Sequence, residues 1–212
     1  NVLLYKEKIK NSKEVILMTE RIIKEQPFEN HALTFVDVGE LPSICCKAVE
    51  NKNSASRINI LNAYISVILA IIAAKSKNIK NVGVITPYRL QAKLIRAILK
   101  DLLASYDANL LKDIKVATVH KFQGSECDVI IFDTVESYRM KYLGPMLTKD
   151  DSNYLKRFLN VAMTRAKGKF ILVGNYKYLQ DRIKRNSFFY QMIEYVKHYN
   201  YINSNDILQL LN

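Results

Sequence analysis

Short apolar runs alternate with longer stretches of helical periodicity along most of the chain. Five runs have the length and the β-branched or aromatic content of buried strands: 32–38, 82–86, 114–119, 129–134 and 170–173. In the run 129–134, successive positions are apolar rather than alternate ones. This pattern indicates a strand that is covered on both faces, as in a parallel sheet.

The segments between these runs predict helices. The clearest covers 90–103, where leucine and isoleucine recur on one face and lysine and arginine occupy the other. The remaining predicted helices cover 54–74, 151–166, 176–185, 187–199 and 205–211. Strands that alternate with helices of ten or more residues predict an α/β fold, with a parallel sheet flanked by helices on both faces.

The ends of two helices are marked by residues of known preference. Ser54 or Ser56 is suited to cap the helix that runs to residue 74, and Asp151 or Ser152 is suited to cap the helix that runs to residue 166. Gly168 is expected to end the second of these helices. Glycine, proline and asparagine in 39–53, and glycine and proline in 137–150, predict loops with little regular structure.

The chain has 212 residues, enough for one domain with a substantial core. We expect residues 1–30 to form a helical or irregular lead-in and residues 31–212 to form the domain. Because the chain begins with Asn1 rather than Met, we expect it to be a piece of a longer polypeptide. The longest apolar run, 64–74, is shorter than the roughly 20 residues that a membrane span requires, so a buried helix is the better interpretation.

Charge narrows the function only in part. The formal net charge of +12 is typical of domains that contact phosphate backbones, and equally of a lysine-rich surface that maintains solubility. The three cysteines form no CxxC pair, which favours a reduced cytoplasmic compartment. No metal site is expected, since the three histidines are scattered. There is no GxxxxGK[ST] or GxGxxG motif, so a domain working on ATP would need another lobe to hold the triphosphate.

Three polar segments are expected to lie where predicted strands end, and ligands of parallel α/β sheets bind outside the carboxyl ends of strands. The first contains Thr86, Pro87 and Tyr88 at the end of one strand. Its hydroxyls, its aromatic ring and the free N–H groups of the following helix are suited to hold a nucleic-acid backbone or to stack a base. The alternative interpretation is a proline-terminated turn with a buried tyrosine.

The second segment, 118–126, connects two strong strands. Gly124 permits close approach of backbone amides to an anion, and Gln123 and Glu126 are suited to orient a water or a ribose hydroxyl. Thr118 and Lys121 are suited to hold a phosphate backbone. A tight connection between strands with exposed polar residues explains the same segment without any ligand.

The third segment, 159–167, places Asn160 and Thr164 one helical turn apart, with Arg165 at the helix end. A planar guanidinium at this position is suited to the charge that grows on a γ-phosphate during hydrolysis. A solvated surface arginine is the alternative.

Together these segments resemble motifs IV, V and VI of superfamily 1 helicases. The order and spacing match the branch that contains the nonsense-mediated-decay helicase and its senataxin-like and Dna2-like relatives. Gln91 near Pro87 and the Ser56-x-x-Asn59 pattern fit the same branch. The resemblance extends over residues 32–176 and implies a RecA-like, P-loop NTPase-type second lobe without a Walker A motif of its own.

The resemblance implies a role for each matching residue. Arg165 becomes the arginine finger and Glu126 a second catalytic residue, with Gly124 and Gln123 also at the nucleotide. The residues implied at the single strand are Thr86, Pro87, Tyr88, Thr118, His120 and Lys121. His120 departs from the aspartate that is frequent in relatives, which puts the coupling between ATP and strand contacts in doubt.

The function implied is that of the C-terminal motor lobe of an ATP-dependent helicase or translocase. ATP with Mg²⁺ would be held mainly by an N-terminal RecA-like lobe of the same polypeptide, so this chain alone is expected to be inactive. The expected partner is single-stranded nucleic acid, DNA in preference to RNA, and no membrane. Two alternatives are a non-catalytic nucleic-acid-binding or scaffold domain, and a nuclease domain built on carboxylates such as Asp128 and Asp133.

Overall fold

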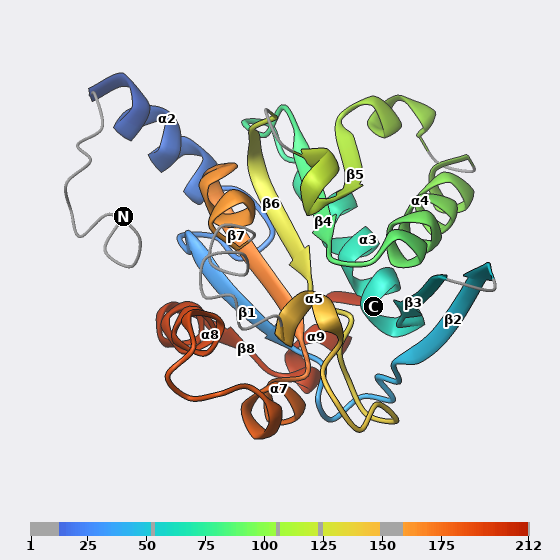
Figure 1. The fold of residues 1–212 in the computed structure, drawn as a ribbon. Helices are drawn as coiled ribbons and strands as arrows, with labels where there is room; N and C mark the ends of the chain where they lie inside the picture. The colour runs from blue at the N-terminus through green and yellow to red at the C-terminus, as the bar shows by residue number, and fades with distance from the viewer. Residues whose placement is uncertain (1–12, 52–53, 105–106, 123–124, 149–158, 212) are drawn as a thin grey trace.

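A parallel sheet of six strands forms the centre of the molecule (Figure 1). The computed structural model describes residues 13–51, 54–104, 107–122, 125–148 and 159–211. The strands of this sheet, in chain order, are β1 (Leu33–Asp37), β4 (Val82–Thr86), β5 (Ile114–Thr118), β6 (Cys127–Asp133), β7 (Ala166–Gly174) and β8 (Tyr201–Ile202). Their spatial order is β5-β4-β6-β7-β1-β8, and every pairing is parallel. All five predicted strands are therefore confirmed.

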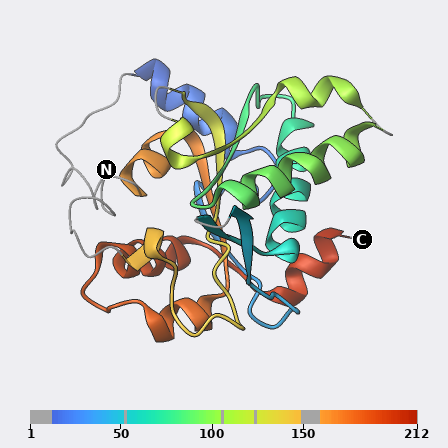
Figure 2. The same cartoon turned by 45° about the vertical axis from the view of Figure 1, so that its right-hand side comes forward.

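Helices cover both faces of the sheet (Figure 2). One face carries α3 (Ile60–Ala74) and α4 (Arg89–Ala104), and the other carries α7 (Tyr176–Arg182) and α8 (Phe188–Tyr199). Strand β6 shows why its sequence is continuously apolar: Val129 and Ile131 pack under α3 and α4, whereas Ile130 and Phe132 face the opposite core. The predicted α/β, RecA-like arrangement is confirmed.

Shorter elements complete the fold. Helix α2 (Lys13–Ile23) lies in the expected lead-in, of which residues 1–12 are outside the described residues. The others are η1 (Ala108–Lys112), η2 (Val119–Phe122), α5 (Pro145–Thr148) and α9 (Ser204–Leu211). Strand β8 was not predicted, because two residues carry no periodicity. Within the described ranges, no helix combines the length and the apolarity needed to cross a bilayer.

The prediction of a loop at 39–53 is wrong in its second half. Strands β2 (Cys46–Asn51) and β3 (Ser54–Ile58) form an antiparallel hairpin beside the sheet (Figure 1). The predicted cap at Ser54 or Ser56 is wrong for the same reason, since both residues belong to β3. Asn59 caps α3 instead, because its side chain accepts a hydrogen bond from the Asn62 amide at 3.1 Å.

The prediction that Gly168 ends a helix is also wrong. Residues 159–164 are helical, as predicted, but β7 already begins at Ala166, which pairs with Cys127 of β6. Residues 151–158 of that predicted helix lie outside the described residues. Gly168 lies within β7, where α2 crosses it so closely that any Cβ would overlap Ile22. The glycine therefore serves packing of the lead-in helix rather than helix termination.

Candidate functional site

The predicted site residues lie at two opposite edges of the sheet. Thr86 and Thr118 are the last residues of β4 and β5, at the carboxyl edge. Glu126 directly precedes β6, and Arg165 directly precedes β7, so both lie at the amino edge. The expectation that all three segments follow carboxyl ends is therefore wrong for these two residues. Both belong to connections that have already returned to the start of the next strand.

At the amino edge, Glu126 and Arg165 are neighbours on adjacent strands. The Cys127 amide donates to the Arg165 carbonyl at 2.9 Å, and Cys127 is in register with Ala166. Glu126 is exposed and Arg165 is half-buried. The ladder between β6 and β7 thus fixes the backbones of a carboxylate and a guanidinium side by side.

Two polar atoms near this position have no partner in the described part of the chain. They are Nε of Arg165 and Oδ1 of Asn160, and both are buried. Asn160 lies in the helix at 159–164 and Arg165 directly follows it, and within this helix the Thr164 hydroxyl donates to the Asn160 carbonyl at 2.8 Å. Burying an unpaired guanidinium N–H is costly, and an anionic ligand with acceptor oxygens would satisfy it. The unpaired Arg165 donor therefore fits a phosphate group, whereas Oδ1 of Asn160 is an acceptor and would need a separate donor.

The connection from β5 to β6 links the two edges. It leaves β5 after Thr118, passes through η2, and reaches β6 on the far side of β4. Phe122 at the end of η2 is fully buried, whereas His120 and Lys121 are exposed. Gln123 and Gly124 belong to this connection but lie outside the described residues.

At the carboxyl edge, the predicted strand contacts fall into two groups. Thr86, Pro87 and Tyr88 are buried, and the Thr86 hydroxyl has no partner within the described residues. Thr118 is half-buried, and the chain continues from it into η2, where His120 and Lys121 are exposed. Among the predicted strand contacts, the side chains that meet solvent are therefore those of Thr118, His120 and Lys121.

Tyr88 belongs to a buried cluster around Glu136. The carboxylate of Glu136 accepts from the Tyr88 hydroxyl, pairs with the Arg57 guanidinium, and accepts from the Gly144 amide at 3.1 Å. Burial raises the pKa of Glu136, and the Tyr88 and Arg57 partners oppose that shift. Sequence reasoning missed this cluster, because nothing local to Glu136 or Arg57 marks them as a pair.

A second buried network joins Gln91 to Asp133. The Gln91 side-chain amide donates to Asp133 at 2.6 Å and to the Asn59 carbonyl at 2.9 Å, and it accepts from the Asn59 amide at 2.8 Å. Asn62 donates to the other Asp133 oxygen at 3.1 Å. Burial raises the pKa of Asp133 to about 6, although these donors lower it. Gln91 and Asn59 therefore hold α3, α4 and β6 together. Across the described ranges, no three His, Cys, Asp or Glu residues are grouped to hold a metal ion.

Comparison with known proteins finds a family model and several helicases that are similar to this chain. A family model described as an AAA domain matches residues 1–177. Helicase sen1 of Schizosaccharomyces pombe is 37% identical over 101 residues, and RNA helicase Mov10l1 of Mus musculus is 40% identical over 102 residues. These alignments cover 47% and 45% of this chain. An uncharacterized ATP-dependent helicase of Methanocaldococcus jannaschii is 28% identical over 212 residues, which cover 99% of this chain.

The chain corresponds to only a part of each relative. It spans 5% of the sen1 helicase, 7% of the Mov10l1 helicase and 28% of the archaeal helicase. The similarity extends over the strands that carry the predicted motifs, and the resemblance to the senataxin-like branch is confirmed by the sen1 match.

Proposed function

We propose that this chain, which belongs to the AAA domain family, is the C-terminal motor lobe of an ATP-dependent nucleic-acid helicase or translocase. The three relatives described above are named helicases. One of them is named an ATP-dependent helicase, and its alignment covers nearly the whole of this chain. The proposal assigns ATP contacts to the amino edge of the sheet and strand contacts to its carboxyl edge.

The observation that carries the proposal is the state of Arg165. Its Nε is buried and lacks a partner within the described residues, and the adjoining backbone is fixed by the ladder between β6 and β7. A buried guanidinium that projects from a fixed backbone position is suited to meet charge on a transferring phosphoryl group. Arginine fingers of this kind contribute about 10³- to 10⁵-fold to the rate of hydrolysis.

Glu126 and Arg165 would then meet the nucleotide together, and Gln123 and Gly124, which lie outside the described residues, stay predicted nucleotide contacts. Glu126 is exposed next to Arg165 and is suited to orient a water or a ribose hydroxyl. Mg²⁺ would be held mainly by an N-terminal RecA-like lobe of the same polypeptide, together with the triphosphate, whose charge it would help to neutralise. Without that lobe, the 212-residue chain should not hydrolyse ATP.

Thr118, His120 and Lys121 are the proposed side-chain contacts to a single strand. They leave the carboxyl end of β5 and include an exposed cation. Thr86, Pro87 and Tyr88 would shape the same edge from beneath, because their side chains are buried. We expect the single strand to be DNA in preference to RNA. Measuring ATP hydrolysis with each polymer compares the two directly.

The connection through η2 provides a route from the strand to the nucleotide. It joins Thr118 at one edge to Glu126 at the other, and Phe122 anchors it on the sheet. Closure of two lobes over ATP would therefore move the strand contacts as one piece with the amino edge.

The test is ATP hydrolysis by the whole polypeptide, with and without single-stranded DNA or RNA. Arg165→Ala should lower turnover by about 10³-fold or more while ATP binding, measured with a fluorescent nucleotide, is retained. Arg165→Lys should recover little, because an ammonium lacks the planar fork of the guanidinium.

Arg185→Ala is the matched control, since Arg185 is an exposed arginine that follows α7. It should leave turnover unchanged. Normal hydrolysis by a folded Arg165→Ala protein would refute the arginine-finger assignment. Absence of hydrolysis in the wild-type protein with either polymer would instead support a scaffold function.

A further inference from the structure

The loop that follows β6 presents aromatic and basic side chains at the carboxyl edge of the sheet. Tyr142 is 69% exposed and Tyr138 is 40% exposed. Arg139 and Lys141 lie between them and are also exposed. No aspartate or glutamate occurs from residue 137 to 144. We name residues 138–142 the aromatic–basic loop.

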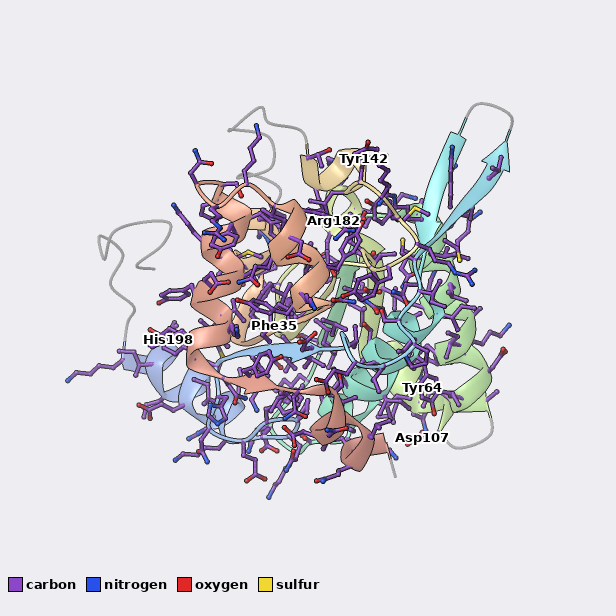
Figure 3. All side chains as sticks on the ribbon, turned by 90° about the horizontal axis from the view of Figure 1, so that it is seen from below. Phe35, Tyr64, Asp107, Tyr142, Arg182 and His198 are labelled. Atoms are coloured by element: carbon purple, nitrogen blue, oxygen red, sulfur yellow. The ribbon has the colours of Figure 1, made fainter. Side chains whose placement is uncertain are left out.

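This loop is held in place by α7, although four of its five side chains are exposed and only Met140 packs against the core. The Tyr178 hydroxyl donates to the carbonyl of Met140 at 3.0 Å. Nε of Arg182 donates to the carbonyl of Lys141 at 3.3 Å, and its guanidinium lies 4.0 Å from the centroid of the Tyr178 ring. The backbone at the tip of the loop is therefore fixed from below. Figure 3 shows Arg182 and Tyr142 together on one side of the molecule.

Both ends of the loop are also anchored. The Ser137 hydroxyl donates to the Ser43 carbonyl at 2.6 Å, and the Cys45 amide donates to the Tyr138 carbonyl at 3.1 Å. At the other end, the Gly144 amide donates to Glu136 at 3.1 Å. Because the loop is already ordered, a ligand that binds it does not have to meet the entropic cost of ordering its backbone.

We propose that the aromatic–basic loop is a stacking site for bases of single-stranded nucleic acid. Exposed tyrosine rings stack any base, and neighbouring cations attract the phosphate backbone. Tyr142 already has such a cation beside it, since Nζ of Lys141 lies 5.4 Å from the centroid of its ring. The combination of exposed rings, two cations and no acid fits a polyanion that carries flat bases.

The position of the loop fits one continuous strand. Only β4 lies between β5 and β6, so the carboxyl ends that carry Thr118 and this loop are separated by about 10 Å. A single strand that contacts Thr118 and Lys121 and runs across the carboxyl edge would therefore pass the end of β6, from which the chain continues into this loop. This inference rests on the proposed function, because it extends the strand path of the motor lobe.

The test measures binding of the whole polypeptide to fluorescent oligo-dT and oligo-U by anisotropy. Tyr142→Ala should weaken binding about 5- to 150-fold, the range expected for the loss of one stacked base. Tyr142→Phe should bind like the wild-type protein. An abasic oligonucleotide of equal length should bind wild type and Tyr142→Ala equally, because it has phosphates but no bases.

Tyr199→Ala is the control, since Tyr199 is a 54% exposed tyrosine on α8. Unchanged oligo-dT and oligo-U binding by Tyr142→Ala would overturn the stacking site, as would an equal loss on the abasic oligonucleotide. In either case an intact effect of Arg165→Ala on hydrolysis would leave the proposed function standing. Failure of the wild-type protein to bind either polymer would overturn both proposals.

Discussion

The ring of Phe122 lies directly over Gly83, so close that a Cβ on Gly83 would come within 2.5 Å of the ring. Gly83 is the second residue of β4, and Phe122 ends η2. The connection from β5 to β6 crosses β4 at this point. The connection can be short because Gly83, the residue of β4 beneath it, has no side chain. The crossing ties the proposed strand contacts to the proposed nucleotide contacts.

Gly83→Ala should therefore destabilise the fold and disturb the 118–126 segment. The added methyl would collide with Phe122 and with Ile130, and overpacking of this kind costs about 1–3 kcal/mol of unfolding free energy. Urea denaturation measures the loss. Combining Gly83→Ala with Phe122→Leu should cost less than the sum of the two single changes, because the leucine makes room. Strict additivity would show that the two residues do not interact.

Tyr88→Phe and Lys121→Ala should separate stability from strand binding. The first removes a hydrogen bond to the buried Glu136 carboxylate and should cost about 1–3 kcal/mol of unfolding free energy. The second removes an exposed cation and should weaken nucleic-acid binding, more so at low salt, with little effect on stability. Denaturation and anisotropy on both variants provide the comparison. Weaker binding by a fully stable Tyr88→Phe protein would instead place Tyr88 at the strand.

The strands were predictable because burial on two faces leaves a direct trace in the sequence. The run at β6 is apolar at every position from Val129 to Phe132, since alternate residues enter opposite cores. The hairpin of β2 and β3 leaves no such trace. Its Val49 is 70% exposed, so pairing between the two strands defines it rather than a hydrophobic face.

Long-range contacts account for the remaining errors. A glycine after a predicted helix fits a helix end, but at Gly168 the deciding neighbour is Ile22, from the start of the chain. The pairing of Arg57 with Glu136 likewise depends on the fold, since 79 residues separate them. Among the site residues, Arg165 and Glu126 were predicted from motif order. Their position at the amino edge follows only from the strand register.

The contribution of Asp133 to the stability of the chain should fall as the pH rises from about 4 to 6. Burial raises the pKa of Asp133 to about 6 in the folded protein, and an unfolded aspartate titrates near 3.9. Between these values the folded state holds the proton that the unfolded state has released, so raising the pH favours unfolding. The loss amounts to roughly 3 kcal/mol and is complete above pH 6.

Urea denaturation at several pH values, compared between wild type and Asp133→Asn, checks this. Asparagine cannot accept from Gln91, Asn62 and Val135 at once, so the variant should be less stable overall. The informative quantity is the difference in pH dependence. If Asp133→Asn loses stability between pH 4 and 6 as steeply as wild type, another group is responsible.

Lys169→Met should loosen the attachment of the lead-in to the sheet. The Lys169 ammonium is buried and donates to the carbonyls of Glu25, Pro27 and Phe28, the latter two at 2.8 and 3.0 Å. Methionine fills similar space but leaves these carbonyls without their donor, at a cost of about 1–3 kcal/mol of unfolding free energy. Hydrogen exchange of the α2 amides should accelerate more than that of the α4 amides.

The same variant has a signature in alkaline solution. Burial lowers the pKa of Lys169 to about 8, below the value near 10.4 of an unfolded lysine. Between these values the unfolded state holds the additional proton, so this lysine makes wild type gain stability as the pH rises from 8 to 10. Cysteines and tyrosines titrate in both proteins, so their effects cancel in the comparison. The deficit of Lys169→Met relative to wild type should therefore grow with pH over this range, and a constant or shrinking deficit would show that Lys169 does not titrate there.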